Sequence, residues 1–417
     1  MSFLRRFLDP DSIGRPQWIA GALLLLYLAQ CLWLIRLQTI HGALPESDHS
    51  LCIYNGLEQW RGRSVAGTPE ALRSEAVTGI PSSGRQGHLR VRDGYDVDRS
   101  PFYYLVAAAP ALVPIPGIPP DSTLGQIWIT TPYLFFGAML GASLWYVSRR
   151  LYGNVGGYLA LALYCFSPGV ILSTAGTQNL GEMSGVWGAF GIVFTGIAVA
   201  HTLYAPREVV LWNSRRILLL GLAMALAVGT QFSLAAIAIV VLPIMFWVAP
   251  VRPRAVLAIW STAIAVGAVL LAASYFFRFD LFWQSIRRAR WIDFQNRAFA
   301  MPASYSQILK TLAAQSPALI LALPAALVAY IAWRRARYFG NTAPLLITAL
   351  LIILSVAAPT FPGQGFHLAA LVFLFVFVAG VFADLFETTQ GPLVTAAAAS
   401  LVGAGALWNI VQLFRLR

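Results

Sequence analysis

Long apolar runs separated by short polar connections recur along almost the whole chain. Each run holds roughly 16 to 24 residues, the length that a helix needs to cross a hydrocarbon layer about 30 Å thick. Of the 417 residues, 58% are hydrophobic and 11% are charged, whereas soluble domains carry about 25% charged residues. A single soluble core cannot bury about ten such runs. Residues 1–417 are therefore predicted to form one all-α polytopic membrane domain.

The apolar runs predict about eleven transmembrane helices. Their expected ranges are about 18–37, 126–147, 154–173, 181–204, 216–231, 233–249, 255–276, 317–333, 343–358, 366–384 and 392–413. The first large loop, 41–125, should carry juxtamembrane helices outside the membrane. A second outer loop, 277–316, is rich in arginine.

The formal net charge of +12 bears on orientation. In a membrane protein such a balance indicates positive-inside loops and contact with anionic lipid, so no nucleic-acid partner is predicted. The arginine-rich start predicts an uncleaved first span with a cytoplasmic N-terminus, in a cell inner membrane. In this layout the basic connections face the cytoplasm. These are Arg149 with Arg150, Arg215 with Arg216, Arg252 with Arg254, and Arg334 with Arg337.

The stretch 101–120 allows two interpretations. It is apolar but short, and Pro114, Pro116, Pro119 and Pro120 end it. A full crossing would place the later basic connections outside. A re-entrant or surface helix would keep them inside, and the positive-inside rule favours this second interpretation.

The stretch 41–100 of the first outer loop holds eight of the 17 acidic residues. Asp48 stands about ten residues after the first span, and Leu51, Ile53, Tyr54 and Leu57 after it fit one stripe of a helix. Asp48 could therefore serve only as the N-cap of that helix. The alternative is a carboxylate held at the membrane surface as a general base.

The second outer loop departs from the positive-inside trend, because it carries Arg287, Arg288 and Arg290. These guanidinium groups could bind a phosphate bidentately. They could equally contact lipid headgroups. His367 at an outer span boundary has two interpretations as well: a ring satisfied by its own turn, or a hydrogen bond to substrate.

Several motifs occur in an order that resembles the GT-C membrane glycosyltransferases, in particular the protein O-mannosyltransferase and aminoarabinose-transferase group. They are the acidic residue soon after the first span, Asp98-Arg-Ser-Pro-Phe-Tyr-Tyr-Leu105, Arg149-Arg-Leu-Tyr-Gly153, Tyr164-Cys-Phe-Ser-Pro168 and the stretch 219–233. The likeness covers roughly residues 1 to 250. The family often has an acidic residue in the second outer loop, for which Glu182 is the candidate counterpart, and a lysine where this chain has Gln231.

This resemblance implies transfer of a sugar from a polyprenyl-phosphate donor to an acceptor on the periplasmic face. Asp48 would be the catalytic base. The substrate-binding candidates are Arg99, Tyr103, Glu182, Arg287, Arg288, Arg290 and His367. No metal site and no certain cofactor are predicted, although a divalent metal remains open. The expected partners are the donor, membrane lipid, an acceptor that is a lipid, glycan or protein, and a membrane-complex subunit.

Two alternatives stay open. One is a non-catalytic subunit of a membrane complex that keeps the GT-C-like fold. The other is a lipid or oligosaccharide carrier, which would need a continuous polar path through the spans. The near absence of acidic residues within the predicted spans argues against a carrier.

Overall fold

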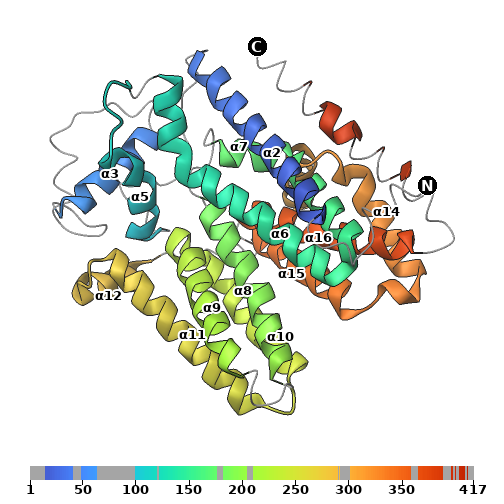
Figure 1. Cartoon of the computed structure of the whole chain (residues 1–417). Coiled ribbons are helices and arrows are strands. Elements are labelled where there is room, and N and C mark those ends of the chain that lie inside the picture. The colour runs from blue at the N-terminus through green and yellow to red at the C-terminus, as the bar shows by residue number, and fades with distance from the viewer. Residues whose placement is uncertain are drawn as a thin grey trace.

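Helices form all the regular structure in the described part of the chain (Figure 1). The computed structural model describes residues 15–40, 48–62, 99–119, 122–175, 182–203, 210–289, 291, 301–357 and 365–387, together with short helical pieces between 396 and 411. No strand occurs in these ranges, so the all-α prediction is confirmed for them. The predicted last span, 392–413, lies largely outside the described residues.

The described ranges between residues 15 and 387 form fourteen α-helices and three short 3-10 helices. Their bounds are α2 Arg15–Ile40, α3 Asp48–Trp60, α5 Pro101–Ala108, η1 Ala109–Leu112, α6 Thr123–Cys165, α7 Pro168–Thr174, α8 Glu182–Thr202, α9 Val210–Thr230, η3 Phe232–Leu234, α10 Ala235–Val248, α11 Pro253–Ser274, α12 Phe279–Arg288, α13 Pro302–Gln315, α14 Leu319–Ala332, η5 Arg334–Ala336, α15 Phe339–Ala357 and α16 Gly365–Phe386.

Six helices in the described residues are long and apolar enough to cross a membrane: α2, α6, α8, α11, α15 and α16. A seventh crossing is available if α13 and α14, which meet at a bend of 110°, form one broken span. The chain is therefore a multi-pass membrane protein, while the count of eleven spans stays a prediction. The helix observed at the expected span 317–333 is shorter than predicted: α14 holds 14 residues.

The long helix α6 folds back on itself at Gly153, where φ is +74°. The Tyr164 hydroxyl donates a hydrogen bond to the Gly137 carbonyl, 2.6 Å away and 27 residues earlier. A straight helix would hold these residues about 40 Å apart. A Cβ on Gly157 would also touch the backbone of Arg149. The connection between the predicted spans 126–147 and 154–173 therefore falls where expected.

The second of those spans is not one helix, and the prediction for 154–173 is corrected here. The second arm of α6 ends at Cys165, and α7 starts only at Pro168. Proline lacks the N–H that would continue the helix. The Ser167 hydroxyl instead donates to the Gln315 carbonyl, 2.7 Å away, so this break meets the bend between α13 and α14.

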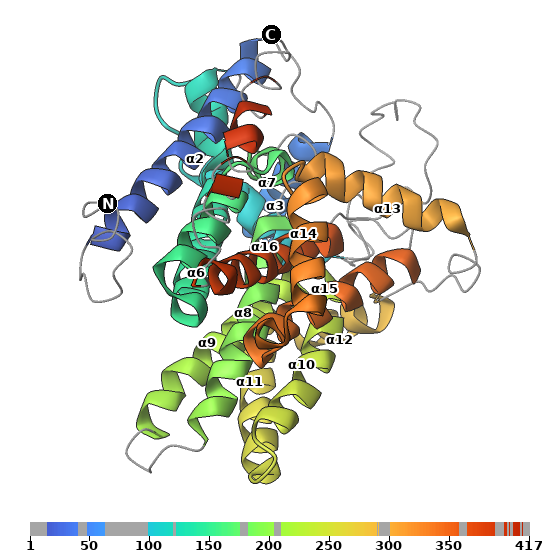
Figure 2. The same cartoon turned by 90° about the vertical axis from the view of Figure 1, so that its right-hand side faces the viewer.

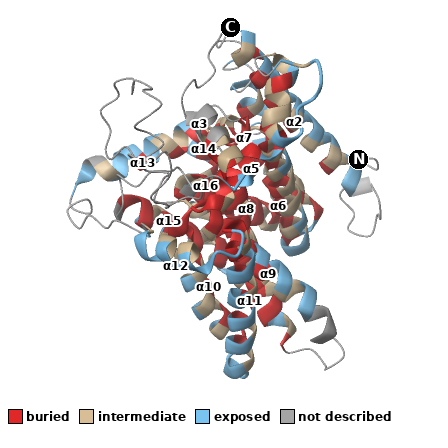
Figure 3. Ribbon diagram, turned by 90° about the vertical axis from the view of Figure 1, so that its left-hand side faces the viewer, coloured by how far each residue is buried: buried red, intermediate tan, exposed pale blue. Residues whose placement is uncertain are grey.

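Helix α16 forms the centre of the core (Figure 3). Its sequence is apolar on every side, which is the pattern of a helix surrounded by other helices. It packs against α6, α8, α14 and α15. The Phe373 ring stacks on Phe190 and Phe194 of α8.

The basic connections gather at one end of the helix bundle, which we call the basic end. The Tyr152 hydroxyl near the α6 fold-back donates to the Gly340 carbonyl, 2.6 Å away, at the start of α15. The Phe339 ring contacts His201 at the end of α8 and Trp247 at the end of α10. Figures 1 and 2 both show the end of α8, the start of α9 and the α10–α11 connection toward one tip of the molecule.

Helices α2 and α6 run antiparallel, which decides the question of residues 101–120. Leu24 lies against Gly141, and Tyr27 lies against Gly137, which precedes it in α6. The end of α2 and the start of α6 therefore lie at the same end of the bundle, opposite the basic end. Helices α5 and η1 span at most about 20 Å, too little for a crossing. This geometry fits the interpretation of 101–120 as a surface or re-entrant segment and not as a full crossing.

Candidate functional site

Helix α5 is held on the end of α9 by its N-cap residue. The buried Ser100 hydroxyl donates to the Gly229 carbonyl, 2.6 Å away, and accepts from the Phe102 N–H at 3.2 Å. One side chain therefore starts helix α5 and also fixes it to the membrane bundle. The next residue, Pro101, stands at a position where a helix tolerates proline.

Helix α3 packs closely on α5 through Gly56. A Cβ at this position would lie 2.1 Å from the Tyr104 carbonyl oxygen, so only glycine permits the observed distance between the two backbones. The Trp60 indole N–H donates to the Leu105 carbonyl, 3.1 Å away, and adds a second link. Both juxtamembrane helices are thus attached to the bundle through α9.

Four residues come together where α3, α5 and α6 meet, three from these helices and one from just before α5. We call them the Arg99 cluster: Cys52, Arg99, Tyr103 and Tyr133. The Arg99 guanidinium carbon lies 4.0 Å from the centroid of the Tyr103 ring. Cys52 packs against the group that contains Tyr103 and against the group that contains Tyr133. Both tyrosines are buried. Arg99 and Tyr103, two predicted site residues, are therefore in direct contact.

Burial raises the pKa of Tyr103 well above its ordinary value, and the positive charge of Arg99 opposes this shift. The phenol is consequently neutral at physiological pH. A neutral phenol can donate a hydrogen bond to an anion but cannot act as a general base there. Tyr103 is therefore not a candidate for a general base.

Asp48 is the first residue of α3, so the helix that the sequence predicts after it is confirmed. Position 48 lies one turn before Cys52, and residues four apart share a face of an α-helix. Position 48 thus stands on the face of α3 that carries Cys52 toward the Arg99 cluster. The Asp48 side chain itself lies outside the described residues.

Glu182 is the first residue of α8 and is 4% exposed. Two residues further along α8, the Ser184 hydroxyl forms a buried hydrogen bond of 2.8 Å with the Thr230 hydroxyl. Thr230 follows Gly229, which accepts the hydrogen bond from Ser100. The start of α8, the end of α9 and the start of α5 therefore adjoin one another, and Glu182 shares an end of the bundle with Arg99.

The arginine-rich loop lies at this same end, but its described arginines are exposed and are not members of the Arg99 cluster. Arg287 and Arg288 are exposed in the last turn of α12, and the Arg287 guanidinium carbon lies 5.1 Å from the Trp283 ring centroid. Arg290 lies outside the described residues. The structure thus places Arg287 and Arg288 on a surface helix and not in the Arg99 cluster.

His367 stands near the start of α16 and is partly buried. Neither ring nitrogen has a hydrogen-bond partner among the described residues. Most of the turn before it, 358–364, lies outside the described residues, so both interpretations of His367 stay predictions.

Sequence reasoning missed Cys52, Tyr133 and Ser100. The spacing of four between Asp48 and Cys52 could have assigned Cys52 to the site face of α3. Tyr133 could have been noticed as a polar side chain within a predicted span. No sequence signal pairs Ser100 with Gly229, because that bond depends on how two distant helices pack.

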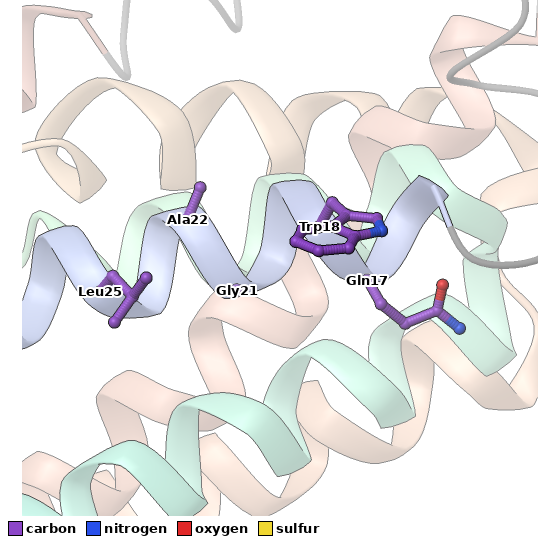
Figure 4. Close-up of a pocket in the computed structure, with 5 residues that line it drawn as sticks. All are labelled: Gln17, Trp18, Gly21, Ala22 and Leu25. Carbon is purple, nitrogen blue, oxygen red and sulfur yellow. The ribbon is translucent and has the colours of Figure 1, made fainter.

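No metal centre emerges from the part of the chain that the structure describes, where no group of three or more His, Cys, Asp or Glu side chains could hold an ion. A shallow hollow lies along the first turns of α2, lined by Gln17, Trp18, Gly21, Ala22 and Leu25 (Figure 4). The first turns of α2 lie toward the basic end. The Arg99 cluster lies at the opposite end of the bundle, so the hollow is separate from it.

Fold and site together define an all-α, multi-pass membrane protein with a polar cluster under two juxtamembrane helices. The chain matches no protein-family model, and no curated protein sequence matches it. Its function is therefore argued from the residues of the site.

Proposed function

We propose that this protein is a GT-C-type membrane glycosyltransferase, moving a sugar from a polyprenyl-phosphate donor to an acceptor at the end of the bundle that carries α3 and α5. One observation supports this most strongly: position 48 shares a face of α3 with Cys52, which is a member of the Arg99 cluster. That arrangement brings a carboxylate-bearing position toward a partly buried guanidinium at the end of the bundle.

The two groups suit the two charges that the reaction develops. Asp48 accepts the proton of the acceptor hydroxyl as the bond to the sugar forms. Arg99 stabilises the negative charge that the departing polyprenyl phosphate gains. The neutral Tyr103 phenol beneath Arg99 holds the guanidinium by a cation–π contact, worth about 0.5–2 kcal/mol.

The remaining candidates have secondary roles in this proposal. Glu182 supplies a second carboxylate for acceptor or sugar hydroxyls, and His367 supplies ring nitrogens for a hydrogen bond. Arg287, Arg288 and Arg290 are further ligands for the donor phosphate, arriving along the membrane surface. The outer, periplasmic orientation of this end belongs to the proposal as well.

The test is transfer of labelled sugar from polyprenyl-phosphate donors by the purified, reconstituted protein. Asp48→Asn should lower the rate about 10²- to 10⁴-fold, the usual contribution of a general base. Glu58→Gln is the matched control, because Glu58 is another carboxylate of α3, where it pairs with Arg61 at 3.2 Å. Its variant should transfer at the unmodified rate. Equal rates for Asp48→Asn and the unmodified protein would exclude the base assignment.

The burial of the cluster favours a second candidate. Tyr103 and Tyr133 are only 3% and 0% exposed, so the cluster can also be a packed structural element of a non-catalytic subunit. That candidate predicts no transfer from any donor by the unmodified protein alone. It also predicts co-purification with a stoichiometric membrane partner.

A further inference from the structure

Helix α12 differs from the other helices that follow a candidate span, because none of its residues is buried. Its sequence, Phe279-Asp-Leu-Phe-Trp-Gln-Ser-Ile-Arg-Arg288, places apolar residues at 279, 282, 283 and 286. This spacing of i, i+3, i+4 and i+7 is that of an amphipathic helix. Helix α12 therefore has an apolar face that the rest of the protein covers only in part.

One side of α12 is fixed on the end of α11. The Tyr275 hydroxyl donates to the Ser285 hydroxyl, 2.6 Å away, and the rings of Tyr275 and Phe282 meet edge to face at 5.4 Å. Leu281 packs against the cluster that Tyr275 forms with Leu271. These three contacts set the rotation of α12 about its own axis.

A second side is apolar and uncovered. Phe279 is 65% exposed and Trp283 is 53% exposed, and the two stand one turn apart. Ile286 borders them on the helix surface, since successive residues turn by about 100°. Aromatic side chains exposed in this way beside membrane spans are typical of the lipid–water boundary.

The third side is polar, and an arginine marks its border. Asp280, Gln284 and Arg288 follow one another at intervals of four residues, and all three are exposed. Arg287 lies between this polar side and Trp283, over whose ring it stacks. An apolar stripe flanked by cations is the pattern of a helix that lies in the membrane interface.

The position of α12 in the chain agrees with this pattern. The candidate span α11 ends at Ser274, and α12 begins five residues later. Between them the N–H groups of Phe276 and Phe277 bond to the carbonyls of Ala273 and Ala272, and both phenylalanines have positive φ, +52° and +56°. This is a Schellman turn, which ends a helix and redirects the chain sharply. Helix α12 therefore starts where a membrane crossing stops.

We infer that α12 lies in the membrane–water interface, with Phe279 and Trp283 among the acyl chains and Arg287 and Arg288 on the phosphates of anionic lipid headgroups. The inference does not rest on the proposed sugar transfer, because any bilayer of phosphate-bearing lipids satisfies it. It commits to the bulk lipid surface as the occupant of the uncovered side of α12.

Spin-label accessibility in the full chain tests the inference. The protein carries Cys52→Ser and a nitroxide at either Phe279→Cys or Gln284→Cys, and is reconstituted into phosphatidylcholine vesicles. The label at 279 should collide mainly with lipid-soluble oxygen. The matched label at 284, on the polar side, should collide mainly with a water-soluble nickel complex. Ile286→Cys is a second lipid-side variant in case Phe279 is needed for folding.

The arginines are tested by adding phosphatidylglycerol to the vesicles. The label at 284 should then become less mobile, and this change should vanish in the Arg287→Gln/Arg288→Gln background. Aqueous accessibility at both 279 and 286 would overturn the interfacial placement. Identical mobility with and without phosphatidylglycerol would overturn the assignment of Arg287 and Arg288 to headgroup phosphates.

Discussion

The rings of Trp60 and Phe276 meet edge to face with their centroids 6.1 Å apart. Trp60 ends α3 in the first large loop, and Phe276 lies in the turn between α11 and α12. This contact brings together the two loops that the sequence predicts on one face of the membrane. It also gives a reason for a phenylalanine at a position where helices usually end with glycine.

The contact predicts a coupling between the two rings. Phe276 adopts a φ of +52°, which costs a non-glycine residue about 1–2 kcal/mol, while its ring pair contributes about 0.5–1.5 kcal/mol. Phe276→Gly should therefore change the melting temperature of the detergent-solubilised protein little. In a Trp60→Leu background the same substitution should raise it clearly. Equal shifts in the two backgrounds would show that the rings are not coupled.

Gly56 should not tolerate a larger side chain. Gly56→Ala places a Cβ 2.1 Å from a backbone oxygen, so α3 must shift away from α5, at a cost of about 1–3 kcal/mol. Faster amide hydrogen exchange over 48–60 would report the shift. The control is Gly21→Ala, where no atom lies within 4 Å and the helix should gain about 0.5–1 kcal/mol. Unchanged exchange in the Gly56 variant would contradict the packing described.

Ser100 should contribute more than an ordinary N-cap. Ser100→Ala removes both the cap of α5 and the bond to Gly229, for a combined cost of about 1.5–3 kcal/mol. Ser122→Ala is the matched control, because Ser122 caps α6 and donates only to the nearby Pro119 carbonyl. It should cost about 1 kcal/mol. Thermal unfolding compares the two, and equal losses would remove the role assigned to the Gly229 bond.

The burial of Tyr103 should make the stability of the folded protein fall at alkaline pH. Its pKa is higher in the folded protein than in the unfolded chain, so the folded state keeps a proton that the unfolded state releases. The stability that the neutral phenol contributes is complete below about pH 10 and is lost above it, by about 1.4 kcal/mol per pH unit. Unfolding measured between about pH 9 and about pH 11 should show this loss.

Tyr103→Phe is the comparison for that measurement, because phenylalanine keeps the ring under Arg99 but has no proton to lose. The stability difference between the unmodified protein and this variant should shrink or reverse as pH rises. A difference that stays constant across the range would contradict the burial of the Tyr103 hydroxyl.

Much of the fold follows from local sequence pattern. The apolar runs identify the candidate spans, the stripe after Asp48 identifies α3, and the connection at Gly153 falls between two predicted helices. These features depend on residues close together in the chain, where hydropathy and backbone preference act directly.

The site required the tertiary structure. Cys52 and Tyr133 share a cluster, Ser100 meets Gly229, and Arg287 lies on an exposed helix apart from Arg99. None of these relationships has a local signal, because each depends on which helix faces pack together. The sequence alone determined an all-α chain of apolar helices with polar loops. Only tertiary packing decided that the tyrosine in contact with Arg99 is buried while Arg287 and Arg288 stay exposed, because burial depends on neighbours far away in the sequence.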